Sequence, residues 1–138
     1  MATILVIDDN PEVCETLVNI LEDAGYAVAS AQDGREGMLK FRSIEPDLVI
    51  TDIFMPNQEG IQTIREILSL RPQARIIAAS GGMGDCGSAN LMSGSFYLKL
   101  AQKMGALDIL PKPFEIEDLI DRVERLLADA ARGKAQTA

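Results

Sequence analysis

The chain has 138 residues, of which 47% are apolar and 25% are charged, a composition typical of one globular domain and not of a disordered protein. Its formal net charge of −8 argues against sequence-independent binding to nucleic acid or to anionic membranes. It contains no histidine, which excludes Ser-His-Asp and Cys-His catalysis, the usual zinc sites, and a phosphohistidine carried by this chain.

The first half of the chain alternates strand-like and helix-like segments. The continuous apolar run "ILVI" (4–7) is typical of a parallel strand that is buried on both faces. Asn10 and Pro11 then predict the start of a helix that ends at Gly25 and contains Cys14, which we expect to be a small buried residue. A weaker strand is predicted at 27–30, followed by a helix over about 33–44.

The alternation continues through the second half. The run "DLVIT" (47–51) predicts a third strand, and the helix after it has one apolar face, formed by Ile61, Ile64, Ile67 and Leu68. A fourth strand is predicted at 75–79, before a loop rich in glycine and serine and a helix over about 89–104. The fifth strand is predicted at 107–110, and apolar residues at helical spacing between Ile116 and Leu127 indicate the last helix.

Five strand–helix units predict a doubly wound α/β fold, with a five-stranded parallel sheet in the order 2-1-3-4-5 and helices on both faces. We expect one domain over 1–130 and a short polar tail over 131–138 that frays. No apolar run reaches the length of a membrane span, and the N-terminus lacks the pattern of a signal peptide, so we expect a cytoplasmic protein.

Polar side chains follow the predicted strands, at the edge where ligands bind in folds of this class. Asp8 and Asp9 follow the first strand, and Asp52, Ser80 and Lys112 follow the third, fourth and fifth. Each residue alone would be an ordinary helix cap, turn former or solvated charge. Together, three carboxylates suit a hard cation such as Mg²⁺, and a metal-bound carboxylate beside a hydroxyl and a lysine can accept a phosphoryl group.

These residues resemble the receiver domain of two-component response regulators, which has a flavodoxin-like fold. The matching segments are "ILVIDDN", "DLVITDIFMPNQEG", "IIAAS" and "GALDILPKPF", and the likeness covers about residues 3–130. It implies a stand-alone response regulator that is phosphorylated by a partner histidine kinase or histidine phosphotransfer protein. It further implies an unidentified downstream protein, no nucleic acid or membrane partner, a monomer or weak homodimer, and no enzyme activity beyond self-phosphorylation and dephosphorylation.

The resemblance also implies a role for each site residue. Asp52 would be the phosphoacceptor, and Mg²⁺ would be bound directly by Asp9, Asp52 and the backbone carbonyl of Phe54, and through water by Asp8. Lys112, with a cis bond to Pro113, would pair with Asp52 and then with the phosphoryl oxygens, and Ser80 would be the switch hydroxyl. The output face would comprise the helix at 89–104, the strand at 107–110 and the last helix.

Three positions depart from the family pattern. Ile109 stands where Tyr or Phe usually forms the aromatic half of the switch. Phe54 stands where small or polar residues are common, and we expect it to shield the phosphoryl group and lengthen its lifetime. The segment from Ser80 to Gly105, with its Gly/Ser-rich part at 81–95, is longer and richer in glycine than usual, which leaves a partner-specific loop and a flexible insertion equally open.

Parts of the sequence also bear on three other functions. "GMGDCG" (82–87) fits a dinucleotide fingerprint, but a single predicted strand follows it. A phosphatase of the haloacid-dehalogenase type would carry an acid where Phe54 stands, and would need a cap domain. The alternative that stays open is a pseudo-receiver, an interaction module that works without phosphorylation, which Ile109 favours and the intact acids oppose.

Overall fold

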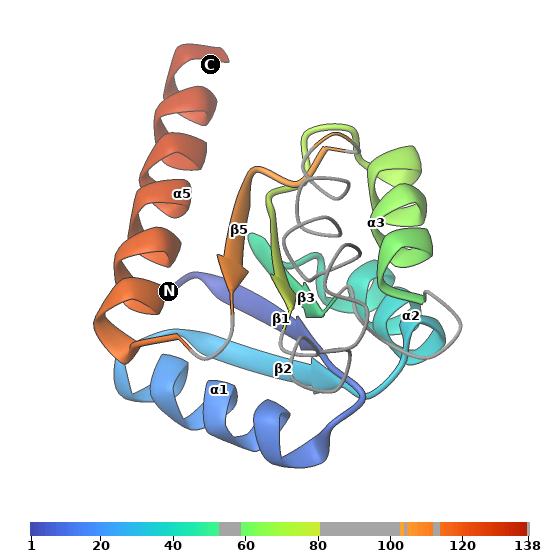
Figure 1. Ribbon diagram of the computed structural model, residues 1–138. Helices are drawn as coiled ribbons and strands as arrows, with labels where there is room; N and C mark the ends of the chain where they lie inside the picture. The colour runs from blue at the N-terminus through green and yellow to red at the C-terminus, as the bar shows by residue number, and fades with distance from the viewer. Residues whose placement is uncertain (53–58, 81–102, 104, 112–113, 138) are drawn as a thin grey trace.

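The protein is described from a computed structural model, which covers residues 1–52, 59–80, 103, 105–111 and 114–137. Five strands form one parallel sheet in the order β2-β1-β3-β4-β5, which confirms the predicted topology (Figure 1). The strands are β1 Thr3–Ile7, β2 Ala27–Ala31, β3 Leu48–Asp52, β4 Ile76–Ser80 and β5 Asp108–Pro111. This order brings the carboxyl ends of β1 and β3 side by side near the middle of the sheet.

The described helices cover both faces of this sheet. They are α1 Pro11–Asp23, α2 Gly34–Ile44, α3 Glu59–Leu70 and α5 Ile116–Thr137. Helices α1 and α5 lie on one face and α2 and α3 on the other (Figure 1). The helix predicted at 89–104 falls almost entirely outside the described residues.

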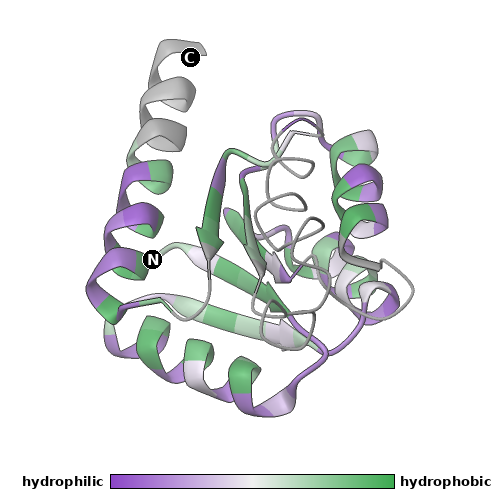
Figure 2. Cartoon of the chain, in the orientation of Figure 1, coloured by the Kyte–Doolittle hydropathy of each residue, from purple (hydrophilic) through white to green (hydrophobic). Residues whose placement is uncertain are grey.

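The core consists of two apolar layers, one on each face of the sheet. Alternate residues of a strand point to opposite faces, so Ile4 and Val6 pack with the residues of α1 and α5, whereas Leu5 and Ile7 pack with those of α2 and α3. All four side chains are fully buried. Figure 2 shows this pattern as apolar strands and helices whose apolar side faces the sheet. Burial on both faces explains why the strands read as continuous apolar runs.

Side-chain caps begin the first two helices where the sequence predicts them. The side chain of Asn10 accepts a hydrogen bond from the Glu12 amide at 2.9 Å, with Pro11 as the first helical residue. The Asp33 side chain likewise accepts from the Glu36 amide at 2.7 Å. Gly25, with φ of +102°, follows the end of α1 in the left-handed region that glycine adopts without strain. These caps set the points at which the chain leaves the sheet edge.

The observed bounds differ from the predicted ones by a residue at several strand ends and by more at the end of α5. Asp52 and Ser80 are the last residues of β3 and β4, not the residues after them, because Asp52 pairs with Ala79 and Ser80 with Pro111 in the parallel ladder. The backbone of residues 131–137, predicted to fray, continues α5 to Thr137. Five of these seven residues are alanine, arginine, lysine or glutamine, which have high helix propensity and favour the extension despite Gly133 and Thr137.

Among the described residues, no helix combines the length and the apolar character needed to cross a bilayer.

Candidate functional site

Three carboxylates meet at the edge where β1 and β3 end. Asp8, Asp9 and Asp52 each place one carboxylate oxygen within 4.8 Å of the other two. The register of the sheet produces this meeting, because Ile7 of β1 pairs with Thr51 of β3 and the residue after each of them in the chain is an aspartate. The prediction that the acids of the first and third strands converge is therefore confirmed.

Burial differs among the three acids. The residues Asp8 and Asp52 are only 2% and 7% exposed, whereas Asp9 is exposed. Two buried carboxylates so close together repel each other in a medium that screens charge weakly, and a cation between them offsets this repulsion. An all-oxygen donor set, partly buried and open on one side at Asp9, fits a hard divalent cation that keeps part of its water shell. This edge is a candidate Mg²⁺ site.

Hydrogen bonds hold the first acid in place. The Asn10 amide donates to Oδ1 of Asp8 at 2.9 Å, and the Asp8 amide donates to the carbonyl of Ala31 at 3.0 Å. The thiol of Cys14 donates to the carbonyl of Asp8 at 3.2 Å. Cys14 is buried, as its place in the helical pattern predicts. Its contact with Asp8 was not predicted, since a weak thiol donor leaves no signal in the sequence.

The neighbouring strand ends complete the edge as far as it is described. Thr51 donates its hydroxyl hydrogen to the Asp52 carbonyl at 3.2 Å, next to the site. The backbone of Ser80 ends β4, one strand over from Asp52, and pairs with Pro111 of β5. Lys112 follows Pro111 directly in the chain. Lys112, Pro113 and Phe54 lie outside the described residues, so the roles expected of them stay predictions.

Ile109 occupies the position where the family usually has an aromatic residue. Its side chain is half-buried and packs against the apolar layer on the α2–α3 face. Its carbonyl accepts a hydrogen bond from Nη1 of Arg122, and the same nitrogen donates to Oδ1 of Asp108 at 2.6 Å. Arg122 thereby attaches α5 to β5. This link was missed because the two segments are 13 and 14 residues apart and the arginine reads as an ordinary helical surface charge.

Several known proteins similar to this chain are chemotaxis or receiver-domain proteins by their descriptions. The chemotaxis protein CheY of Thermotoga maritima is 33% identical over 124 residues, which cover 89% of this chain and 95% of that protein. A response regulator receiver domain protein from Clostridium thermocellum has a solved structure that matches with a TM-score of 0.76 and 31% identity, covering all of both chains. A CheY-like receiver domain protein from Methanospirillum hungatei matches with a TM-score of 0.83 and 25% identity, over 96% of this chain and 98% of that one.

Some relatives are longer than this chain. The response regulator MprA of Mycolicibacterium vanbaalenii is 36% identical over 124 residues, which are 90% of this chain but 49% of that protein. The family model described as response regulator receiver domain matches residues 4–124, a span that contains all three clustered acids and, except for Leu126, the buried residues of both apolar layers. The chain belongs to the response regulator receiver domain family.

Proposed function

We propose that this protein is a single-domain response regulator in which Asp52 accepts a phosphoryl group from a phosphohistidine of a partner kinase or phosphotransfer protein. The observation that carries this proposal is the cluster of Asp8, Asp9 and Asp52 at the end of two central strands. Membership of the receiver family supports the same chemistry. The absence of histidine from the chain fits a phosphoryl donor on another protein.

The reaction forms one bond, between oxygen and phosphorus, and breaks one bond, between phosphorus and nitrogen. A carboxylate oxygen of Asp52 attacks the phosphorus, the bond between phosphorus and the imidazole nitrogen breaks, and the nitrogen keeps the electron pair and takes a proton. The side chain of Asp52 is held at the end of β3 by a backbone that is paired with β4. A fixed, largely buried carboxylate loses little freedom when it reacts, which lowers the barrier.

The acids around Asp52 have a supporting role. Asp9 and Asp52, with the carbonyl of Phe54, would bind Mg²⁺ directly, and Asp8 would bind it through water. When bound, Mg²⁺ supplies positive charge that offsets the negative charge of the carboxylates and of the incoming phosphoryl oxygens. The hydrogen bonds to Asp8 from Asn10 and to its carbonyl from Cys14 keep this acid pointing to the site.

Ser80 and Lys112 would bind the phosphoryl oxygens after transfer and so favour a second conformation of the surface that contacts a downstream protein. The protein would turn over no external substrate, and its own phosphorylation and dephosphorylation would be its only reactions. Phe54 would slow the loss of the phosphoryl group. A Phe54→Asn variant that loses the group no faster than the native protein would refute this last point.

Intact mass after incubation with acetyl phosphate and Mg²⁺ tests the proposal. We expect a gain of one phosphoryl group in the native protein and none in Asp52→Asn or in the presence of a chelator. Beryllium fluoride, which mimics a phosphoryl group, should bind the native protein in the same medium. If neither reagent modifies or binds the protein, the pseudo-receiver that Ile109 favours replaces this proposal.

A further inference from the structure

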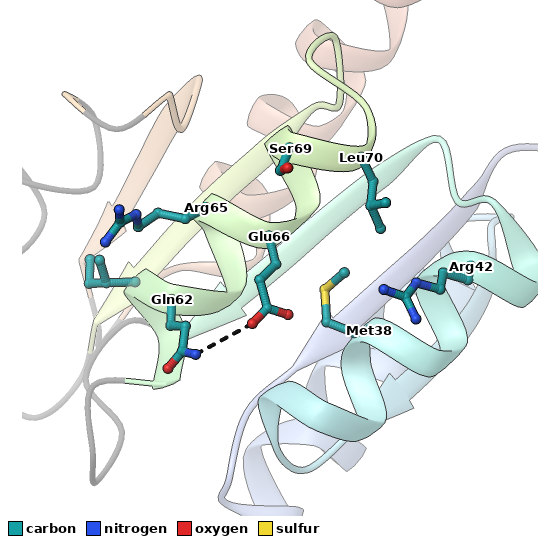
Figure 3. A pocket seen from close by; sticks show the side chains of 8 residues that line it. Met38, Arg42, Gln62, Arg65, Glu66, Ser69 and Leu70 are labelled. Carbon is teal, nitrogen blue, oxygen red and sulfur yellow. Dashed lines mark hydrogen bonds between the residues drawn. The ribbon is translucent and has the colours of Figure 1, made fainter.

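A groove runs between α2 and α3, on the outer side of the helices that cover one face of the sheet. Its larger part has a volume of about 660 Å³ and a second part, of about 370 Å³, adjoins it. The two parts share Met38, Arg42, Gln62 and Glu66, so they form one continuous groove. Figure 3 shows Met38, Arg42 and Glu66 in the space between the two helices.

The lining of the groove combines apolar side chains with three arginines, Arg35, Arg42 and Arg65, and one acid, Glu66. Met38, at its floor, is buried, whereas Leu39 on α2 is 61% exposed and Leu70 at the end of α3 is 51% exposed. Arg35, Leu39 and Arg42 follow one another at helical spacing along the exposed side of α2. This places an exposed leucine between two exposed guanidinium groups on the wall of the groove.

Two cations near Arg35 and Arg42 are already paired with acids. Lys40 pairs with Glu36 at 3.5 Å, and Arg71 pairs with Glu45 at 3.2 Å and lies 5.1 Å from the ring centre of Phe41. Arg35 and Arg42 form no ion pair with another residue in the part of the chain that the structure describes. Their guanidinium groups are available to carboxylates, which they bind in a planar, two-pronged geometry.

The basic character of α2 contrasts with the rest of an acidic chain. Helix α2 carries Arg35, Lys40 and Arg42 against Glu36, a net charge of +2, whereas α1 carries four acids and no cation. The whole chain has a net charge of −8. A positive helix on so negative a protein attracts acidic partners locally and repels them elsewhere, which gives orientation to the encounter.

We propose that the groove between α2 and α3 is a docking site for an acidic amphipathic helix of a partner protein. Apolar side chains of that helix contact Met38, Leu39 and Leu70, and its carboxylates pair with Arg35 and Arg42. The walls of the groove are helix surfaces whose backbone is already hydrogen-bonded, so an added strand would find no ladder partners there. A helix satisfies its own backbone and binds with side chains alone.

Two other occupants fit the groove less well. A nucleic acid offers phosphates to the arginines but nothing to the exposed leucines, and the net charge of the chain opposes it. A second copy offers the acids of α1, but among the described residues no large exposed apolar side chain lies on that helix. On the described part of α5, Ile116 is the one large apolar residue that is exposed, and acids flank it. One apolar side chain cannot contact both leucines of the groove.

The test is the binding of a synthetic helical peptide of about 14 residues with leucines along one face and glutamates on its flanks. Its position is read from amide NMR shifts of the unphosphorylated native protein, so the result is separate from that of the acetyl phosphate experiment. The affinity is compared with that of an Arg35→Glu/Arg42→Glu variant. A Lys103→Glu/Arg125→Glu variant makes the same total change in charge on other exposed residues and is the control.

We expect shifts centred on α2 and α3, and an affinity reduced about tenfold or more by the groove variant but changed less than about threefold by the control. Equal binding of a peptide with lysine in place of glutamate would overturn the proposal. Equal binding by the two double variants, shifts centred elsewhere, or no binding would do the same. Displacement of the peptide by a single-stranded oligonucleotide, or concentration-dependent shifts at the groove without peptide, would assign it to nucleic acid or to a second copy.

Discussion

The acidic cluster at the end of β1 and β3 and the basic groove between α2 and α3 are built in different ways. The cluster is formed by residues at the ends of paired strands, and two of its three acids are buried. The charges of the groove stand on the exposed side of helices, and the groove exists only because two helices pack side by side. Strand register determines the first region, and helix packing determines the second.

This difference has a consequence for what each region can do. Buried carboxylates at fixed positions can hold an ion and react, because their geometry changes little and the surroundings screen charge weakly. Exposed arginines on helices are solvated and mobile, and each contributes little to stability. Such residues suit the recognition of a partner that brings its own carboxylates and apolar side chains. The two regions should therefore respond to different substitutions.

The largest expected effect is that each region can be disabled by substitution while the other keeps its function. Asp52→Asn should abolish phosphoryl uptake from acetyl phosphate, because the attacking oxygen is lost, and should leave binding of the acidic peptide unchanged. Arg35→Glu/Arg42→Glu should lose peptide binding and take up phosphoryl groups at the native rate. Intact mass and peptide titration measure the two outcomes. A groove variant that phosphorylates much more slowly would show that the regions are coupled.

The second prediction concerns Mg²⁺ and stability. At about 100 times its dissociation constant, Mg²⁺ should stabilise the native protein by about 2.7 kcal/mol, which is the gain expected of a ligand that binds the folded state alone. Asp8→Asn/Asp9→Asn should lose this gain, because it removes the charge of two of the three carboxylates that would attract the ion. Chemical denaturation with and without Mg²⁺ measures both effects. The groove variant, as control, should keep the full Mg²⁺ effect.

The third prediction tests the contact through which α2 reaches the acidic edge. A Cβ added at Gly37 would lie 2.6 Å from Cδ1 of the fully buried Ile7, the residue before Asp8. Gly37→Ala should therefore destabilise the protein by about 1 kcal/mol, since overpacking outweighs the better helix propensity of alanine. Ile7→Val removes Cδ1, so the double variant should lose less stability than the sum of the single variants. If the losses of stability in the two single variants simply add in the double variant, the strain does not come from the contact between residue 37 and Ile7.

The smallest expected effect lies on the α1–α5 face, which neither region uses. Burial raises the pKa of the Tyr26 phenol above its usual 10.0, and the charge of Glu124 raises the pKa further. Because the pKa of Tyr26 is higher in the folded state than in the unfolded state, the protonated phenol favours folding. This contribution to the free energy of unfolding is fully present below pH 10.0 and is lost as the pH rises through the raised pKa.

Tyr26→Phe should accordingly show a weaker decline in stability than the native protein between about pH 9 and pH 11, as measured by denaturant midpoints. Glu124→Gln should lower the pKa of Tyr26 without restoring it fully, because burial is the larger cause. A native-like decline in Tyr26→Phe would assign the loss of stability to other groups.

Much of the fold was predictable because the sheet is buried on both faces. The run at 4–7 and the run at 48–50 are apolar throughout, a pattern that only a covered strand requires. Asn10 with Pro11, and Gly25, marked the two ends of α1 through local chemistry, and the structure confirms them. The helical backbone of 131–137 was missed, since a polar segment without an apolar face gives no periodic signal.

The sequence by itself determined the acids of the site, because a carboxylate at the end of a buried strand needs either a partner or a chemical role. It could not show that Cys14 donates to the Asp8 carbonyl or that Arg122 attaches α5 to β5, since these contacts join segments that only the packed helices bring together. The groove between α2 and α3 likewise exists only once the helices have packed together. Strand register follows from patterns that can be read along the chain, whereas the meeting of two helix surfaces is decided by the tertiary structure.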